Sequence, residues 1–99
     1  MVLTACSADT APRIAEALVG AKLAGCVQRL PIESTYRWRG DVETAAEVLL
    51  LIKMRAADYS AVEQAILALH DYETPEIVML PVAQGFAGYL SWLGEVTQR

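Results

Sequence analysis

The sequence predicts a single-domain α+β fold, in which two helices cover one face of a four-stranded antiparallel sheet. The chain has 99 residues, which is room for one domain over residues 1–99. Apolar and polar residues alternate with period two through the middle of the chain, as in the strands of a half-buried hairpin. Helical periodicity lies on both sides of this stretch, and one short apolar segment precedes it while another follows. The predicted element order is therefore βαββαβ with a further C-terminal helix.

Residues 1–5 are predicted to form the first, short apolar strand. A helix follows, because Asp9 or Thr10 can serve as its N-cap and Pro12 suits its first turn. Gly25 is expected to end this helix. Apolar residues recur within it at helical spacing, at Ile14, Ala17, Leu18 and Ala21.

Residues 26–38 and 42–54 are predicted to form a hairpin of two long strands. Gly40 and Asp41 suit the centre of a type II′ turn between them, because a glycine leads that turn. Pro31 cannot donate to a strand ladder, so we expect a bulge or a sheet edge there. This turn would place three pairs opposite one another: Trp38 and Glu43, Tyr36 and Ala45, and Ser34 and Glu47.

A second helix is predicted over residues 56–69, followed by a loop, a strand over 77–80 and a short helix over 87–93. The second helix has one apolar face, formed by Tyr59, Val62, Ile66 and Leu69. The complete order is the split-βαβ, ferredoxin-like arrangement.

The strand over 42–54 is apolar on both of its faces. On one face Ala45, Leu49 and Leu51 are apolar, although a sheet covered by helices on one side should alternate. The hydrophobic content of 55% also exceeds the roughly 45–50% of ordinary globular chains. A second subunit is therefore expected to cover this face. The opposite face consists of Val42, Ala46, Val48, Leu50, Ile52 and Met54.

Charge and composition exclude several classes of protein. The formal net charge is −4 and the basic residues are scattered, so we expect no nucleic-acid or membrane partner. No apolar run approaches the roughly 18 residues of a membrane span, and the N-terminus lacks the basic segment of a signal peptide. Cys6 and Cys26 form no CxxC motif, so a reduced, cytoplasmic protein is expected.

Motifs of enzymes are missing from the sequence. It contains no phosphate loop, HExxH, GxSxG or GxGxxG motif. A nucleophilic pair of Cys26 and His70 would have no third orienting group. We therefore expect that the protein is not an enzyme.

Several side chains could nevertheless form a site. His70, the only histidine, is a metal ligand or pocket acid/base in one interpretation and a helix-end residue bonded to free carbonyls in the other. Cys26 is a soft-metal ligand or a small buried apolar residue. Tyr36 and Trp38 share a strand face with Glu47, as the wall of a pocket or as a subunit interface.

The segment 70–76 concentrates ionisable side chains together with Tyr72 ahead of the last strand. Loops of this kind often carry function. Glu73 and Glu76 could bind a hard cation, pair with Lys53 or remain solvated.

Six ordered segments of the chain match a known family, at residues 23–27, 36–40, 47–53, 70–76, 80–82 and 89–93. On these residues the sequence resembles the CutA family of divalent-cation tolerance proteins over nearly the whole chain. The resemblance implies a ferredoxin-like protomer and a tight homotrimer, similar in architecture to the PII signalling proteins. It also implies a role in tolerance of metals, with copper or another divalent cation as the ligand.

The resemblance further implies a cleft between subunits, lined by Cys26, Tyr36, Trp38, Lys53, His70, Tyr72, Glu73 and Glu76. Among the copper ligands of such family members, only His70 is matched here. The expected function is a homotrimeric divalent-metal tolerance protein that binds metal weakly. One alternative is a PII-like trimeric sensor of a small anionic metabolite, and another is a structural trimer that organises a partner protein.

Overall fold

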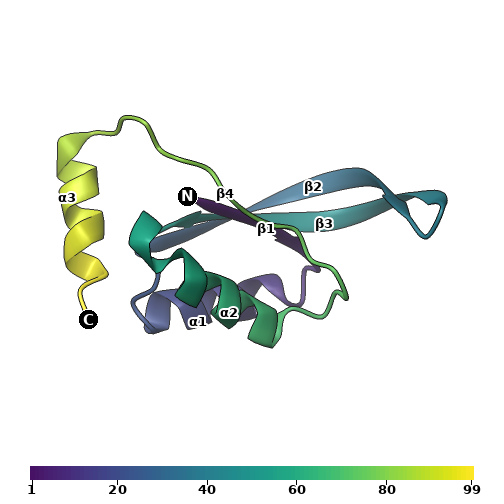
Figure 1. Cartoon of the computed structure of the whole chain (residues 1–99), viewed down its shortest axis with the longest axis horizontal. Coiled ribbons are helices and arrows are strands. Elements are labelled where there is room, and N and C mark those ends of the chain that lie inside the picture. Colours follow the sequence, from purple (N-terminus) through teal and green to yellow (C-terminus); the bar gives the residue numbers. More distant parts are fainter.

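The computed structural model describes all residues from 1 to 99, and its topology confirms the predicted ferredoxin-like fold (Figure 1). The strand order in the sheet is β2-β3-β1-β4, and every neighbouring pair is antiparallel. The elements are β1 (Val2–Cys6), α1 (Ala11–Gly20), β2 (Cys26–Trp38), β3 (Asp41–Lys53), the 3-10 turn η1 (Ala56–Asp58), α2 (Tyr59–Leu69), β4 (Ile77–Met79) and α3 (Ala87–Val96).

One face of the sheet packs against α1 and α2, which lie side by side beneath it (Figure 1). The apolar face of α2 is confirmed, because Val62 and Ile66 are fully buried and Tyr59 and Leu69 pack against the core. In α1 the buried residues are Ala11, Ile14, Ala15 and Leu18. The prediction that Ala17 and Ala21 share this face is wrong, because both are exposed.

Helix α1 ends at Gly20 rather than at the predicted Gly25. The chain reverses at Lys22, which adopts a left-handed conformation with φ +58°. This turn lets the backbone N–H groups of Leu23 and Ala24 both donate to the Leu18 carbonyl. Gly25 lies beyond the turn, where its N–H donates to the Lys53 carbonyl at 3.0 Å.

The long β2–β3 hairpin is confirmed, but its turn lies one residue earlier than predicted. The central turn residues are Arg39 and Gly40, with φ values of +49° and +87°, as in a type I′ turn. The register therefore pairs Trp38 with Asp41 and Tyr36 with Glu43. Because the register moves by two residues, every side chain remains on its predicted face.

Pro31 lies within an uninterrupted ladder, opposite Val48. Of the two predicted explanations for this proline, the sheet edge is confirmed and the bulge is wrong, since β2 is the outermost strand. An edge strand tolerates proline because half of its N–H groups face away from the sheet. The hairpin extends well beyond the helices as an arm, in a molecule of 45 × 26 × 21 Å (Figure 1).

The sheet face opposite α1 and α2 carries an apolar band across all four strands, which we call the open face. It consists of Leu30 on β2, Leu49 and Leu51 on β3, Leu3 on β1 and Val78 on β4. Leu30 is 50% exposed and Val78 is 43% exposed. The predicted second apolar face is therefore present.

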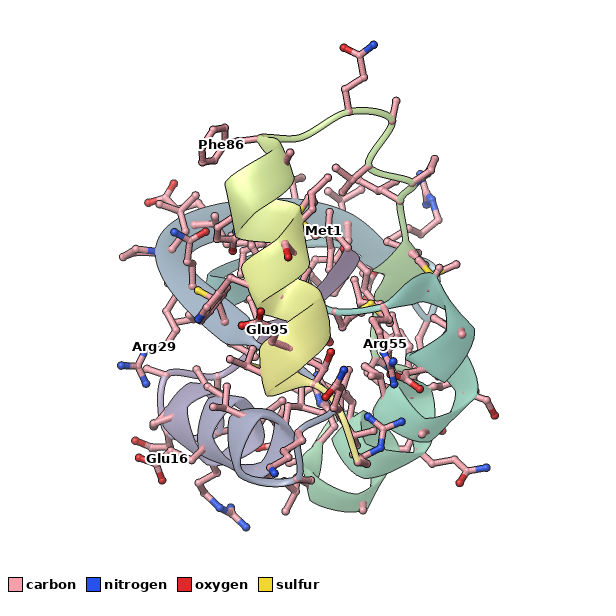
Figure 2. All side chains as sticks on the ribbon, turned by 90° about the vertical axis from the view of Figure 1, so that its left-hand side faces the viewer. Met1, Glu16, Arg29, Arg55, Phe86 and Glu95 are labelled. Atoms are coloured by element: carbon pink, nitrogen blue, oxygen red, sulfur yellow. The ribbon has the colours of Figure 1, made fainter.

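Helix α3 stands beyond the end of the sheet, away from the arm (Figure 1). Figure 2 views the molecule from this end, with α3 in front and Phe86 projecting from its first turn. The side chain of Arg99 ties the end of the chain back to the domain, donating to Asp58 Oδ1 at 2.6 Å and to the Lys22 carbonyl at 2.7 Å. None of the helices has both the length and the apolar character needed to cross a membrane.

Candidate binding pocket

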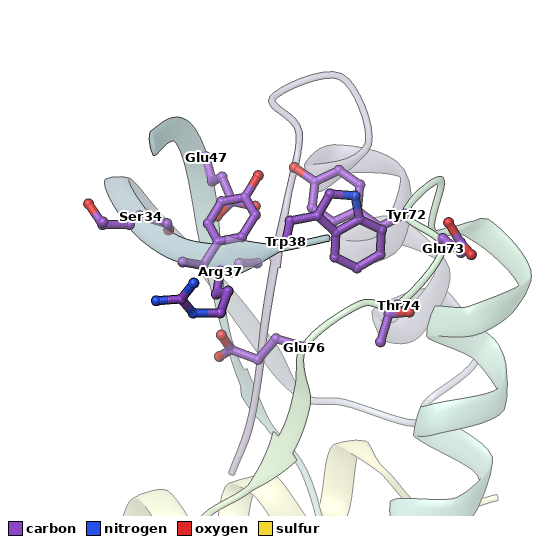
Figure 3. Close-up of a pocket in the computed structure, with 11 residues that line it drawn as sticks. Ser34, Arg37, Trp38, Glu47, Tyr72, Glu73, Thr74 and Glu76 are labelled. Atoms are coloured by element: carbon purple, nitrogen blue, oxygen red, sulfur yellow. The ribbon is translucent and has the colours of Figure 1, made fainter. Parts of the chain in front are cut away.

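A cavity of about 700 Å³ lies between the β2–β3 arm and the loop that connects α2 to β4 (Figure 3). This size is typical of small-molecule sites. We call it the arm pocket. Its lining residues are Ala5, Ser34, Thr35, Tyr36, Arg37, Trp38, Glu47, Tyr72, Glu73, Thr74 and Glu76.

Three aromatic side chains from two elements contribute to the arm pocket. Tyr36 and Trp38 lie on the same face of β2, because strand side chains alternate and these residues are two apart. Tyr72 comes from the loop, where its ring packs on His70 at a centroid distance of 4.7 Å. The three rings are 37–44% exposed, so each keeps surface available to a ligand.

The charge of the arm pocket is predominantly negative. Glu47 from β3 and Glu73 and Glu76 from the loop supply three carboxylates, whereas Arg37 is the single basic lining residue. The pKa of the Tyr72 phenol is raised, mainly by burial and to a smaller extent by the hydrogen bond to Glu47 and the negative charge of that carboxylate. The carboxylates of the lining therefore favour positively charged ligands.

Arg39, in the turn of the arm, reaches one wall of this pocket. Its Nη2 donates to Glu73 Oε2 at 2.9 Å, and its Cζ lies 5.3 Å from the centre of the Trp38 ring. A guanidinium of this chain is thus held by one aromatic face and one carboxylate.

His70 lies beside the arm pocket but does not line it. Its side chain is 1% exposed, and both ring nitrogens are bonded to the main chain. Nδ1 accepts from the Tyr72 N–H at 3.2 Å, so Nε2 carries the proton and donates to the Ala5 carbonyl at 2.9 Å. Metal ligation by His70 would require one of these hydrogen bonds to break.

Cys26 and Lys53 do not line the arm pocket within one protomer. They lie opposite one another at the far end of the hairpin, because the continuous register carries them to the base of the arm. Lys53 Nζ donates there to the Gln28 side chain. Desolvation, together with the nearby Cys26, raises the pKa of Tyr89 at the same end of the molecule.

No group of three or more His, Cys, Asp or Glu side chains is arranged to hold a metal ion. Cys6 is buried in the core, and desolvation, with smaller contributions from Asp71 and Glu47, raises the pKa of its thiol. A raised pKa disfavours the thiolate form that binds soft metals.

Of the eight residues predicted for the cleft, the structure brings five together in the arm pocket: Tyr36, Trp38, Tyr72, Glu73 and Glu76. Glu47 belongs to the set as well, and the period-two pattern indicates this because it places Glu47 on the face of Tyr36. Thr35 and Arg37 carry no such signal, since they alternate onto the other face of β2. Both nevertheless line the cavity.

Comparison with known proteins identifies the family. A family model described as CutA1 divalent ion tolerance protein matches residues 1–96. The chain belongs to the CutA1 family. It is 43% identical over 98 residues to the divalent-cation tolerance protein CutA of Thermus thermophilus, covering 98% of this chain and 95% of that protein.

Solved structures of CutA1 family members share the fold closely. The periplasmic divalent cation tolerance protein CutA of Archaeoglobus fulgidus superposes with a TM-score of 0.95 at 34% identity, covering 98% of this chain and 96% of that one. The PII-like protein CutA of Nostoc superposes with a TM-score of 0.92 at 32% identity, covering 98% and 95% of the two chains. These CutA1 structures therefore support both the topology and the projecting arm.

Proposed function

We propose that this chain is a homotrimeric divalent-cation tolerance protein that binds cations weakly in the arm pocket and catalyses no reaction. The acidic lining of the pocket carries the proposal, because its three carboxylates outnumber Arg37 and the Arg39 that pairs with Glu73, around a cavity of about 700 Å³. Such a lining concentrates cations from solution. The relatives named above carry no enzyme name, which supports a role in binding.

The open face supports the trimer. A contiguous apolar surface across four strands marks an interaction site in a soluble chain. The arm also projects beyond its own domain, where a neighbouring subunit can complete the arm pocket. The trimer would therefore bury the open face and enclose the ligand site in one step.

The identity of the cation follows from the chemistry of the ligands. Carboxylates suit hard ions such as Mg²⁺ and Mn²⁺, whereas copper prefers imidazole and thiolate. His70 is bonded to the main chain on both sides and Cys6 is buried, so copper binding would be weak. Copper ligation by His70 stays a prediction.

The alternative of a PII-like sensor for a small anion is less favoured by the same lining. An anionic metabolite would meet Glu47, Glu73 and Glu76 and could pair only with Arg37 among the lining residues. A purely structural trimer predicts no ligand at all.

Calorimetric titration tests these functions. Mn²⁺ and Cu²⁺ are titrated into the native protein, Glu47→Gln, Glu76→Gln and the control Glu95→Gln, whose side chain lies on distant α3. We expect weak binding that both pocket variants reduce and Glu95→Gln leaves unchanged. Equal affinity in all four proteins would overturn the pocket assignment. Copper affinity unchanged in His70→Gln would remove His70 from the site.

A cytoplasmic location is also proposed, on the grounds that Cys6 and Cys26 are both unpaired. The Archaeoglobus fulgidus relative is described as periplasmic, so the location needs a direct test. Cell fractionation with compartment markers decides it, and recovery in a periplasmic or secreted fraction would overturn the assignment.

A further inference from the structure

We infer that Trp38 and Glu73 form a seat for the guanidinium group of a small organic cation, and that Arg39 occupies this seat as an internal competitor. We call the pair the guanidinium seat. The inference deepens the proposed function and rests on it, since it requires that the arm pocket accepts cations. It names the class of organic ligand: a small molecule with a guanidinium at one end and an ammonium at the other.

The position of Arg39 carries the first step. Its guanidinium carbon lies 5.3 Å from the centre of the Trp38 ring, within the range of a cation–π contact. Its Nη2 donates to Glu73 Oε2 at 2.9 Å, which is the geometry of a charge-assisted hydrogen bond. One aromatic face and one carboxylate therefore already hold a guanidinium in this structure.

The seat can be vacated, because Arg39 is weakly held. Within one protomer its side chain is 72% exposed and that of Glu73 is 68% exposed, so solvent screens their ion pair before a neighbouring subunit encloses the site. An external guanidinium can thus replace the internal one without disturbing a buried network.

The rest of the arm pocket specifies the other end of the ligand. Glu47 and Glu76 remain without a salt-bridge partner, whereas Glu73 is paired with Arg39. A cavity of about 700 Å³ is larger than one metal ion needs and accommodates a short chain between two charged groups. A second positive charge on the ligand would complement these carboxylates, and a negative one would be repelled.

Tryptophan fluorescence provides the test, because the chain has two tryptophans. In a Trp92→Phe background Trp38 is the only indole, and a circular dichroism spectrum confirms that this variant folds. Agmatine, which carries a guanidinium and an ammonium, is titrated in a buffer free of organic amines. The matched control is 4-guanidinobutyrate, in which a carboxylate replaces the ammonium. We expect a saturable change in Trp38 emission with agmatine and much weaker binding of the control.

Three variants in the same background separate the parts of the seat. Glu73→Gln removes the charge-assisted hydrogen bond and should weaken agmatine binding about tenfold. Arg39→Asn removes the competitor, keeps a residue that tolerates the left-handed turn, and should tighten binding about threefold. Arg29→Gln, the control, removes the same charge from β2, at a position outside the arm pocket. If Arg29→Gln and Arg39→Asn tightened agmatine binding equally, the effect would be one of net charge and the competition by Arg39 would be overturned.

Calorimetry with Mn²⁺ on the same samples separates this inference from the proposed function. If Mn²⁺ binds through Glu47 and Glu76 but agmatine does not bind, the guanidinium seat is overturned and the cation-tolerance function stands. If agmatine binds as expected and divalent ions do not, the proposed metal function is overturned while the ligand class is supported. If neither binds, both are overturned.

Discussion

At the scale of single residues, His70 joins three parts of the chain through one buried ring. It follows the last residue of α2, donates from Nε2 to the Ala5 carbonyl at the end of β1, and accepts the Tyr72 N–H in the pocket loop. The loop that carries Tyr72, Glu73 and Glu76 is therefore held to the sheet by this imidazole. His70 lies at the helix end as the structural interpretation predicted, but its ring donates to the Ala5 carbonyl of β1 and not to a free carbonyl of the helix.

Substitution of His70 should lower the free energy of unfolding according to how many of these hydrogen bonds remain. His70→Phe fills the space but leaves the Ala5 carbonyl and Tyr72 N–H without partners, which should cost about 1–3 kcal/mol. His70→Gln retains a donor and an acceptor and should cost less. Guanidinium chloride unfolding measures both variants. If the native protein and His70→Phe were equally stable, the proposed role of His70 in holding the loop to the sheet would be contradicted.

Asp58 and Arg99 give the fold a pH-dependent contact. The hydrogen bond from Arg99 is the main cause that lowers the pKa of Asp58 below its ordinary value of 3.8. A lowered folded-state pKa stabilises the protein above the unfolded-state pKa, and this contribution is lost as the pH falls through the folded-state value.

The part of the stabilising effect of Arg99 that comes from Asp58 should therefore be lost in acid, whereas the hydrogen bond to the Lys22 carbonyl should remain. Arg99→Gln should melt at a lower temperature than the native protein at pH 7. This difference should shrink as the pH falls below the ordinary aspartate pKa and through the lowered pKa of folded Asp58, because the carboxyl is then protonated in both proteins. Thermal melts at several pH values measure the difference. A gap between the two proteins that is independent of pH would show that Asp58 is not the relevant partner.

At the scale of elements, α3 depends on contacts at its C-terminal half. A β-carbon on Gly25 would lie 2.6 Å from Leu93 Cδ1 and 2.9 Å from Val96 Cγ2, so α3 packs directly on the backbone that precedes β2. The sequence suggested that Gly25 ends the first helix. The structure gives the glycine another role, because its missing side chain leaves room for α3 to pack against the backbone.

Gly25→Ala should therefore destabilise the protein by about 1–3 kcal/mol, because the side chains of Leu93 and Val96, or α3 itself, must move to make room. Gly20→Ala is the matched control, since nothing lies within 4 Å of that position at the end of α1. Alanine also favours the helical conformation, so the control should be neutral or slightly stabilising. Denaturant unfolding of both variants decides, and similar stability in the two would contradict the tight packing of α3.

Local pattern explains which elements could be predicted and which details could not. Period-two alternation places Tyr36, Trp38 and Glu47 on one face, and a two-residue register error leaves faces unchanged. The turn lies one residue before its predicted position because Arg39, a residue type rarely found at positive φ, occupies the first turn position. Lys53 lies far from the arm pocket in either register, opposite Gln28 in the predicted one and opposite Cys26 in the observed one. Only a second subunit, which the sequence does not position, could bring it to such a pocket.

At the scale of the whole molecule, the open face predicts assembly. Leu30 on this face and Leu67 on α2 are almost equally exposed in the protomer, at 50% and 51%. Replacement of either by glutamate should therefore cost the protomer little. Only Leu30→Glu should place a charge within the proposed subunit interface.

Sedimentation equilibrium across a wide dilution range measures the result. The native protein and Leu67→Glu should remain trimeric at micromolar concentration, whereas Leu30→Glu should dissociate. A folded native monomer at that concentration would overturn the proposed trimer, and a trimeric Leu30→Glu would place the interface elsewhere.

The uninterrupted ladder of the arm also bears on the order in which the chain folds. The residue pairs nearest its turn, such as Trp38 and Asp41, are close in sequence. The separation along the chain then grows toward the base, where Cys26 pairs with Lys53. By contrast, β1 pairs with β4 across almost the entire chain, as between Val2 and Met79. Closing a short loop costs less entropy than closing a long one. The hairpin can therefore form from its turn before the rest of the sheet assembles. The arm, which lines the pocket, would then be among the first elements to form, and β4 among the last.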